Sequence, residues 1–215
     1  MRNRILFLPI LFFLGSCAVT GGWQFKKETG DVQLYMQEYP DSAIPEFRAT
    51  VKIHSSIEKI MMVLSDFSGY PDWVYRCKSA RVIKLVDFTE AYIYEVIALP
   101  LVRDRDMVIH AQTLRAESGD EMMIRLNAVP DYCNDQDTEP CRKVNKSGLV
   151  RVRQSTGSFH LRRIDEDWVE VTWQQHLDPG GLIPAWATRL NLGATPLRSL
   201  NNLKAKVERE NVTRK

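Results

Sequence analysis

The spacing of apolar positions changes from a strand period to a helix period in the first third of the chain. Apolar and polar side chains alternate between Ile44 and Ile53, which is typical of a half-buried β-strand. From Ile57 to Leu64 apolar residues recur at helical spacing, and Ser55 or Ser56 precedes them as a helix cap. We expect this helix to end before residues 69–71, because the proline there disfavours helix in the residue before it.

Strand patterns dominate the next hundred residues. Turn residues such as Ser118-Gly119-Asp120 separate the strands, and the last two strands form a predicted hairpin. Short connections indicate antiparallel pairing, since parallel strands need long crossovers. With an earlier strand at 32–39, the predicted strands lie near 81–86, 91–99, 106–116, 122–129, 149–155, 158–164 and 168–177.

The C-terminal segment is predicted to be helical. Pro184 suits a first helical turn, and Pro196 predicts a kink or break near 193–195. A long antiparallel sheet needs cover on one face, and this amphipathic helix is available to provide it. The fold class is therefore α+β. The apolar stripe of the helix consists of Ile183, Trp186, Leu190, Leu197, Leu200, Leu203 and Val207.

The first residues are typical of an export signal. Arg2 and Arg4 precede an apolar run at 5–14 that is too short to span a bilayer. The run ends in Leu14-Gly15-Ser16-Cys17, which resembles a bacterial lipobox, in which Cys17 is acylated and becomes the new N-terminus. The alternative is an ordinary secretory signal cut after 16–18. We expect a signal peptide at 1–16, a tether at 17–22, and a periplasmic protein anchored to the outer membrane.

Two further cysteines suggest a disulfide. Cys133 and Cys141 flank a polar stretch, and an oxidising envelope favours their pairing across a short loop. No Cys-x-x-Cys or paired histidines accompany them, so a zinc site is not predicted. Cys77 is then left over, and we expect it to be a buried apolar residue.

The charge balance argues against a nucleic-acid partner. The chain has 29 basic and 27 acidic residues, and without Arg2 and Arg4 the two counts become equal. Nucleic-acid binding needs clustered positive charge.

Several segments, in order along the chain, resemble the START (StAR-related lipid transfer) domain family. The resemblance covers residues 23–209 and implies one START domain at 23–213. The matching segments are 67–74 (FSGYPDWV), 93–96 (IYEV), 104–108 (DRDMV), 148–152 (GLVRV), 178–186 (DPGGLIPAW), 195–197 (TPL) and 200–203 (LNNL).

The resemblance implies a helix-grip fold, in which a curved antiparallel sheet wraps around a long C-terminal helix and encloses a hydrophobic tunnel. It also implies binding of one phospholipid, sterol-like or other lipid, carried or sensed in the cell envelope, with no cofactor and no covalent chemistry. We expect the C-terminal helix to gate the tunnel, with a hinge at Gly180-Gly181 and a second weak point at Gly193 before Pro196. The alternative route for the lipid is the 130–146 loop, which we place beside the tunnel mouth.

Glu95 is the most informative charged residue. It shares a strand face with apolar neighbours, and in sterol-binding relatives the acid at this position pairs with an arginine on the next strand. Ala111 stands where that arginine is expected, and Arg125 is a candidate replacement. The alternative is that the sheet twists Glu95 toward solvent.

The resemblance places other residues in or near the tunnel. Arg105 has two interpretations, a contact with a lipid phosphate or a structural ion pair or turn contact. Tunnel-lining or core positions are expected for Trp173, Trp186, Leu190 and Leu197.

Two other functions remain open at this point. One is a lipid sensor that signals to a protein partner. The other is an enzyme, in which His110 and Glu95 form a catalytic pair on neighbouring strands.

Overall fold

The computed structural model describes residues 22–99, 102–181, 183 and 192–213. None of the helices in these ranges is long and apolar enough to cross a membrane. In chain order the elements are β1 (Gln24–Thr29), β2 (Val32–Gln37), β3 (Glu46–His54), α1 (Ile57–Ser65), the 3₁₀ turn η1 (Phe67–Gly69), α2 (Tyr70–Trp73), β4 (Cys77–Leu85), β5 (Glu90–Ile97), β6 (Arg105–Arg115), β7 (Glu121–Ala128), α3 (Glu139–Asn145), β8 (Val150–Arg151), β9 (Gln154–Arg163), β10 (Trp168–Asp178) and α5 (Ala194–Thr213).

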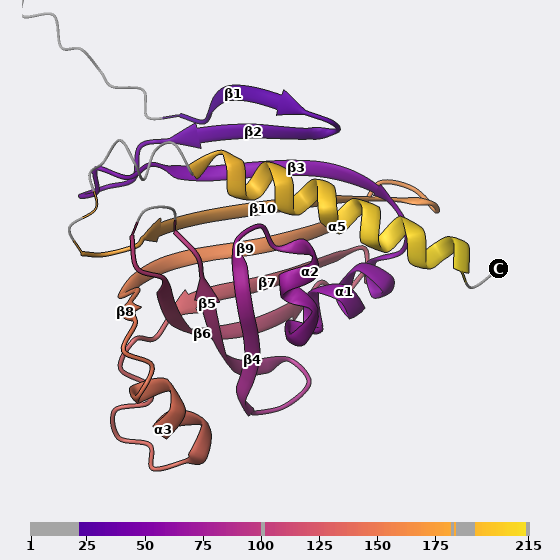
Figure 1. Ribbon diagram of the computed structural model, residues 1–215. Helices are drawn as coiled ribbons and strands as arrows, with labels where there is room; N and C mark the ends of the chain where they lie inside the picture. The colour runs from indigo at the N-terminus through magenta and orange to yellow at the C-terminus, as the bar shows by residue number, and fades with distance from the viewer. Residues whose placement is uncertain (1–21, 100–101, 182, 184–191, 214–215) are drawn as a thin grey trace, which may run out of the picture.

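The strands form one curved sheet in the order β1-β2-β3-β10-β9-β7-β6-β5-β4 (Figure 1). Neighbours along this path are antiparallel, as predicted, and the short β8 adds a parallel pairing with β6. The central pairing of β3 with β10, with Val51 opposite Val171, joins an N-terminal strand to the last strand of the chain. The helix-grip fold is confirmed.

The boundaries of α1 follow from its caps. The Ser56 side chain accepts a hydrogen bond from the backbone N–H of Lys59 at 3.4 Å. The helix ends at Ser65, and the Asp66 carboxylate then accepts the backbone N–H of Gly69 and closes η1. Pro71 lies in the first turn of the separate helix α2, where its missing N–H costs no hydrogen bond.

Helix α5 lies across the concave face of the sheet, against β2, β3, α1 and α2 (Figure 1). Gly193 lies in a turn and α5 begins at Ala194, so the predicted break occurs and Pro196 falls in the first turn. Trp186 and Leu190, which were predicted to belong to the same stripe, lie outside the described residues. The buried part of the stripe, each residue at most 3% exposed, is Leu197, Leu200, Leu203 and Val207.

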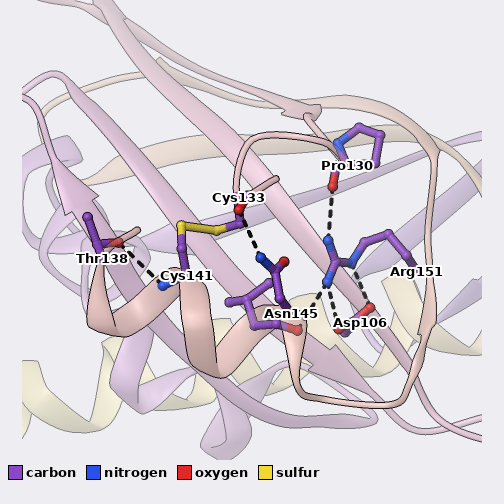
Figure 2. The surroundings of a disulfide bond; sticks show 8 residues. Asp106, Pro130, Cys133, Thr138, Cys141, Asn145 and Arg151 are labelled. Carbon is purple, nitrogen blue, oxygen red and sulfur yellow. Dashed lines mark hydrogen bonds and ion pairs between the residues drawn. A yellow bond between two sulfur atoms is a disulfide. The ribbon is translucent and has the colours of Figure 1, made fainter. Parts of the chain in front are cut away.

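A small lobe around α3 packs on the opposite, convex face of the sheet. Cys133 and Cys141 form the predicted disulfide, with an S–S distance of 2.09 Å (Figure 2). Both cysteines are buried against Tyr94 and Val108. Tyr94 and Val108 alternate along β5 and β6 with the side chains that face the concave side. The lobe therefore packs on the convex face, and its predicted place beside a tunnel mouth stays a prediction.

Asp106 connects this lobe to the sheet. Its carboxylate is fully buried and accepts hydrogen bonds from Arg151, from the Ser147 hydroxyl at 2.7 Å and from the Tyr94 hydroxyl at 2.9 Å. Burial alone would raise the pKa of Asp106, but these bonds outweigh it and lower the pKa below its ordinary value. Arg151 also donates to the Pro130 carbonyl at 2.9 Å (Figure 2), so the ion pair fixes the start of the lobe.

Because α5 covers the core of the concave face, truncating its stripe should destabilise the whole fold. Leu200 is 0% exposed, and we expect Leu200→Ala to lower the free energy of unfolding by about 2–5 kcal/mol. Met62→Ala on α1 is the control, since Met62 is 52% exposed. Urea titrations of both variants test this, and equal effects would contradict the assignment of α5 to the core.

Candidate functional site

The concave face carries a second apolar cluster beside the core that α5 covers. Its side chains come mainly from β5 and β6, toward the other edge of the sheet from β2 and β3. Phe67, Ile97, Leu126 and Leu177 pack against it and are partly exposed. We call this group the inner cluster; its buried members are Ala91, Ile93, Met107, Ile109, Ala111 and Val152.

Glu95 points into the concave side from β5 and is 8% exposed. Directly opposite it are Met107 on β6 and Ala80 on β4, neither of which can neutralise a carboxylate. Burial raises the pKa of Glu95 to about 7, and a hydrogen bond with the Cys77 side chain offsets part of this. Within the described residues no lysine, arginine or histidine forms an ion pair with Glu95.

Neither of the two residues considered as neighbours of Glu95, Ala111 and Arg125, lies opposite it. Ala111 is on the concave face, but it lies opposite Ala91, and Met107 takes the position across from Glu95. Arg125 is exposed on the convex face, because Ile124 beside it points inward and successive residues of a strand alternate. Arg125 therefore does not compensate the buried charge of Glu95.

Arg105 is a turn-stabilising residue in this structure. It is 3% exposed, and it donates to the carbonyl of Pro179 at 3.0 Å and to the carbonyl of Gly180 at 3.1 Å. Gly180 and Gly181 have φ values of +63° and +74°, so the turn after β10 needs glycine at both positions. Arg105 does not pair with Asp106, because adjacent strand residues point to opposite faces.

Trp173 lies in the core that α5 covers and not in the inner cluster. It is 6% exposed, stacks on Phe159 with ring centroids 5.1 Å apart, and meets the edge of Phe47 at 5.2 Å. Its indole N–H has no hydrogen-bond partner in the described part of the chain. Trp173 and Leu197 both belong to the core under α5.

Sequence reasoning missed a polar pair on the concave face. Gln175 donates from its side-chain amide to the Ser155 hydroxyl at 2.9 Å, and Ser155 is buried. The period of two that places Trp173 and Leu177 on this face also places Gln175 there. Ser155 has no such signal, because the strand predicted at 149–155 is divided between β8 and β9.

The suggested catalytic pair of His110 and Glu95 does not form. Their strands are neighbours, but His110 points to the convex face, where its ring lies 2.8 Å from the Glu90 carboxylate and stacks on Tyr92. The described residues also contain no cluster of histidine, cysteine and acidic side chains that could hold a metal ion.

A curved antiparallel sheet with a C-terminal helix on its concave side, and an apolar cluster beside that helix, define the helix-grip class of lipid-binding folds. The START domain family profile matches residues 12–211, and the chain belongs to this family, whose members generally bind and transfer lipids.

Individual proteins are similar to most of the chain. The chain is 26% identical over 210 residues to uncharacterized protein PA1579 of Pseudomonas aeruginosa, covering 97% of this chain and 98% of the relative. It is 29% identical to the crystallised fragment of the STAR-related lipid transfer protein from Xanthomonas axonopodis, with a TM-score of 0.75 over 87% of this chain and 99% of that one. Human StAR-related lipid transfer protein 5 has a TM-score of 0.74 at 15% identity, covering 89% of each chain, and shows the fold alone.

The raised pKa of Glu95 predicts an unusual pH dependence of stability. The folded chain holds this proton more tightly than the unfolded chain, so the free energy of unfolding should fall as the pH rises from 4.5 through 7. Above that range the penalty is about 3 kcal/mol. Glu95→Gln should remove this pH-dependent loss and be more stable than the wild type at pH 8. If the free energy of unfolding depends on pH in the same way in both proteins, folding does not raise the pKa of Glu95.

Proposed function

We propose that the chain binds one lipid-sized apolar molecule against the inner cluster and carries it through the cell envelope. The main observation in support of this proposal is that the concave face extends beyond the part against which α5 packs. The additional surface is apolar, and its partly exposed members Phe67, Ile97, Leu126 and Leu177 can contact a ligand.

The binding energy would come from burial of hydrocarbon. Each methylene removed from water contributes about 0.8 kcal/mol, so an acyl chain or ring system of ordinary size supplies enough energy for stable binding. A few polar groups then orient the ligand. Glu95 and the Gln175–Ser155 pair are the candidates, because all three side chains lie on the concave face.

Glu95 would act as a hydrogen-bonding group for the polar part of the lipid. With a pKa of about 7, its carboxyl group is partly protonated near neutral pH and then has an O–H to donate. A neutral acceptor on the ligand, such as a hydroxyl or carbonyl oxygen, suits this site. The sterol-type ion pair does not apply, since Met107 lies opposite Glu95.

The place of action would be the periplasmic side of the outer membrane. The proposal rests on the lipobox-like segment 14–17 and on Ala18, since no aspartate follows Cys17 to favour the inner membrane. The multiple acyl chains of a lipoprotein provide stable anchoring, which one chain does not.

A lipid sensor is the alternative to a carrier. A vesicle transfer assay distinguishes them, because a sensor binds labelled lipid without increasing its rate of transfer.

Filling the space beside the inner cluster should block lipid binding. Ala111 is 6% exposed on the concave face, and Ala111→Trp places an indole where the ligand would lie. We expect uptake of a fluorescent acyl lipid to fall at least tenfold, with a loss of folding free energy of about 1–3 kcal/mol from overpacking.

Gln112→Trp is the matched control, because Gln112 is the next residue of β6 and points to the convex face. It should bind the fluorescent lipid as the wild type does. Full uptake by a folded Ala111→Trp protein would refute the proposed location of the ligand.

The proposed anchor is tested by Cys17→Ser in the full-length chain. Without the thiol no acyl chains can be attached, so metabolic labelling with palmitate should be lost and the protein should leave the outer-membrane fraction. Unchanged labelling and fractionation of Cys17→Ser would contradict the lipoprotein assignment.

A further inference from the structure

Three segments meet where α5 begins. They are the 74–76 loop after α2 with the start of β4, the described residues 98–99 and 102–104 between β5 and β6, and the first turns of α5. The backbone N–H of Tyr75 donates to the Ser199 hydroxyl at 2.9 Å, and the backbone N–H of Ala98 donates to the Arg76 carbonyl at 2.8 Å. Lys78 pairs with Asp104 across the same junction.

Two arginines share one aromatic ring at this junction. The guanidinium carbon of Arg198, on α5, lies 4.5 Å from the ring centroid of Tyr75, and that of Arg76 lies 5.0 Å from it. Arg76 has a φ of +69°, a left-handed conformation that few residues other than glycine adopt. Its Nε is buried and has no hydrogen-bond partner in the described part of the chain.

The positive charge of this end is not compensated. Within the described residues, Arg76, Arg103 and Arg198 form no ion pair, and Arg103 and Arg198 are exposed. Two acids nearby are already engaged, Asp104 by Lys78 and Asp72 by Lys206, and Glu95 is buried on the concave face. Other exposed arginines are paired, as Arg162 is with Glu170 and Arg153 is with Asp131, whereas Arg81 and Arg125 form no ion pair within the described residues but stand apart from one another on different strands. We call Arg76, Arg103 and Arg198 the arginine end.

We propose that the arginine end docks the protein on the phosphate groups of an anionic lipid bilayer. A guanidinium presents a planar fork that matches two phosphate oxygens, and stacking on Tyr75 keeps two of the three guanidinium groups oriented. Val102, beside Arg103, is 37% exposed and adds an apolar contact. The inference rests on the proposed function, because a carrier must reach a membrane to collect its lipid.

The position of the N-terminus agrees with this docking. Gln24, at the start of β1, pairs with Met36, and a Cβ on Gly193 would lie 3.6 Å from Met36. The start of β1 and the start of α5 therefore lie at the same end of the molecule (Figure 1). An acylated Cys17 would keep this end close to the membrane, since the 17–22 tether spans at most roughly 20 Å.

Vesicle co-sedimentation tests the proposal on the chain from Ala18 onward, which lacks the acyl anchor. The homologous fragment from Xanthomonas axonopodis has been crystallised, so the domain can be studied without the N-terminal segment. Vesicles of phosphatidylcholine alone are compared with vesicles that also contain phosphatidylglycerol. We expect the wild type to bind the anionic vesicles only. The double variant Arg76→Gln/Arg198→Gln should bind them roughly 30-fold more weakly, because each arginine raises the affinity for an anionic surface about fivefold.

Lys52→Gln/Arg125→Gln is the control, because it removes the same charge from exposed positions on the convex face. Equal losses in both double variants would overturn the docking surface, as would anionic binding that persists in Arg76→Gln/Arg198→Gln. Binding to an acidic protein but not to anionic vesicles would also overturn it. Uptake of a fluorescent lipid is measured in parallel. If the wild type takes up no lipid, that result counts against the proposed function and not against the docking surface.

Discussion

The need to shield the concave face of a curved sheet from water governs this structure. A ten-stranded sheet presents a larger apolar surface than one helix covers, and α5 packs against the part formed by β2 and β3. The inner cluster on β5 and β6 continues that surface beyond this region. Exposing it to water would be costly, so it must be covered by another part of the chain or by a ligand. In the proposed carrier, a lipid supplies part of this cover.

Two buried carboxylates on adjacent strands illustrate how the two faces of the sheet differ. Asp106 points to the convex face, where Arg151, Ser147 and Tyr94 satisfy it, and its pKa is lowered. Glu95 points to the concave face, lies opposite Met107, and its pKa is raised. The first carboxylate stabilises the disulfide lobe. The second reduces stability when it is charged, which is expected of a group retained for contact with a ligand.

The sequence predicted the parts of the fold that carry a strong period or a capping signal. The alternation in β10, the Ser56 cap of α1 and the break before Pro196 are all present. Strand β1 was missed because all six of its residues are exposed, so it has no alternation to detect. Helix α3 was missed because it has seven residues and begins next to a proline in a polar stretch. The neighbours of Glu95 depend on the register between β5 and β6, which the pattern of a single strand does not determine.

The binding of one lipid by each chain can be measured by native mass spectrometry of the protein purified under non-denaturing conditions. We expect one lipid-sized adduct on each folded chain, released on denaturation and identifiable by its mass. A folded chain that carries no adduct, and acquires none after incubation with lipid vesicles, would contradict this expectation.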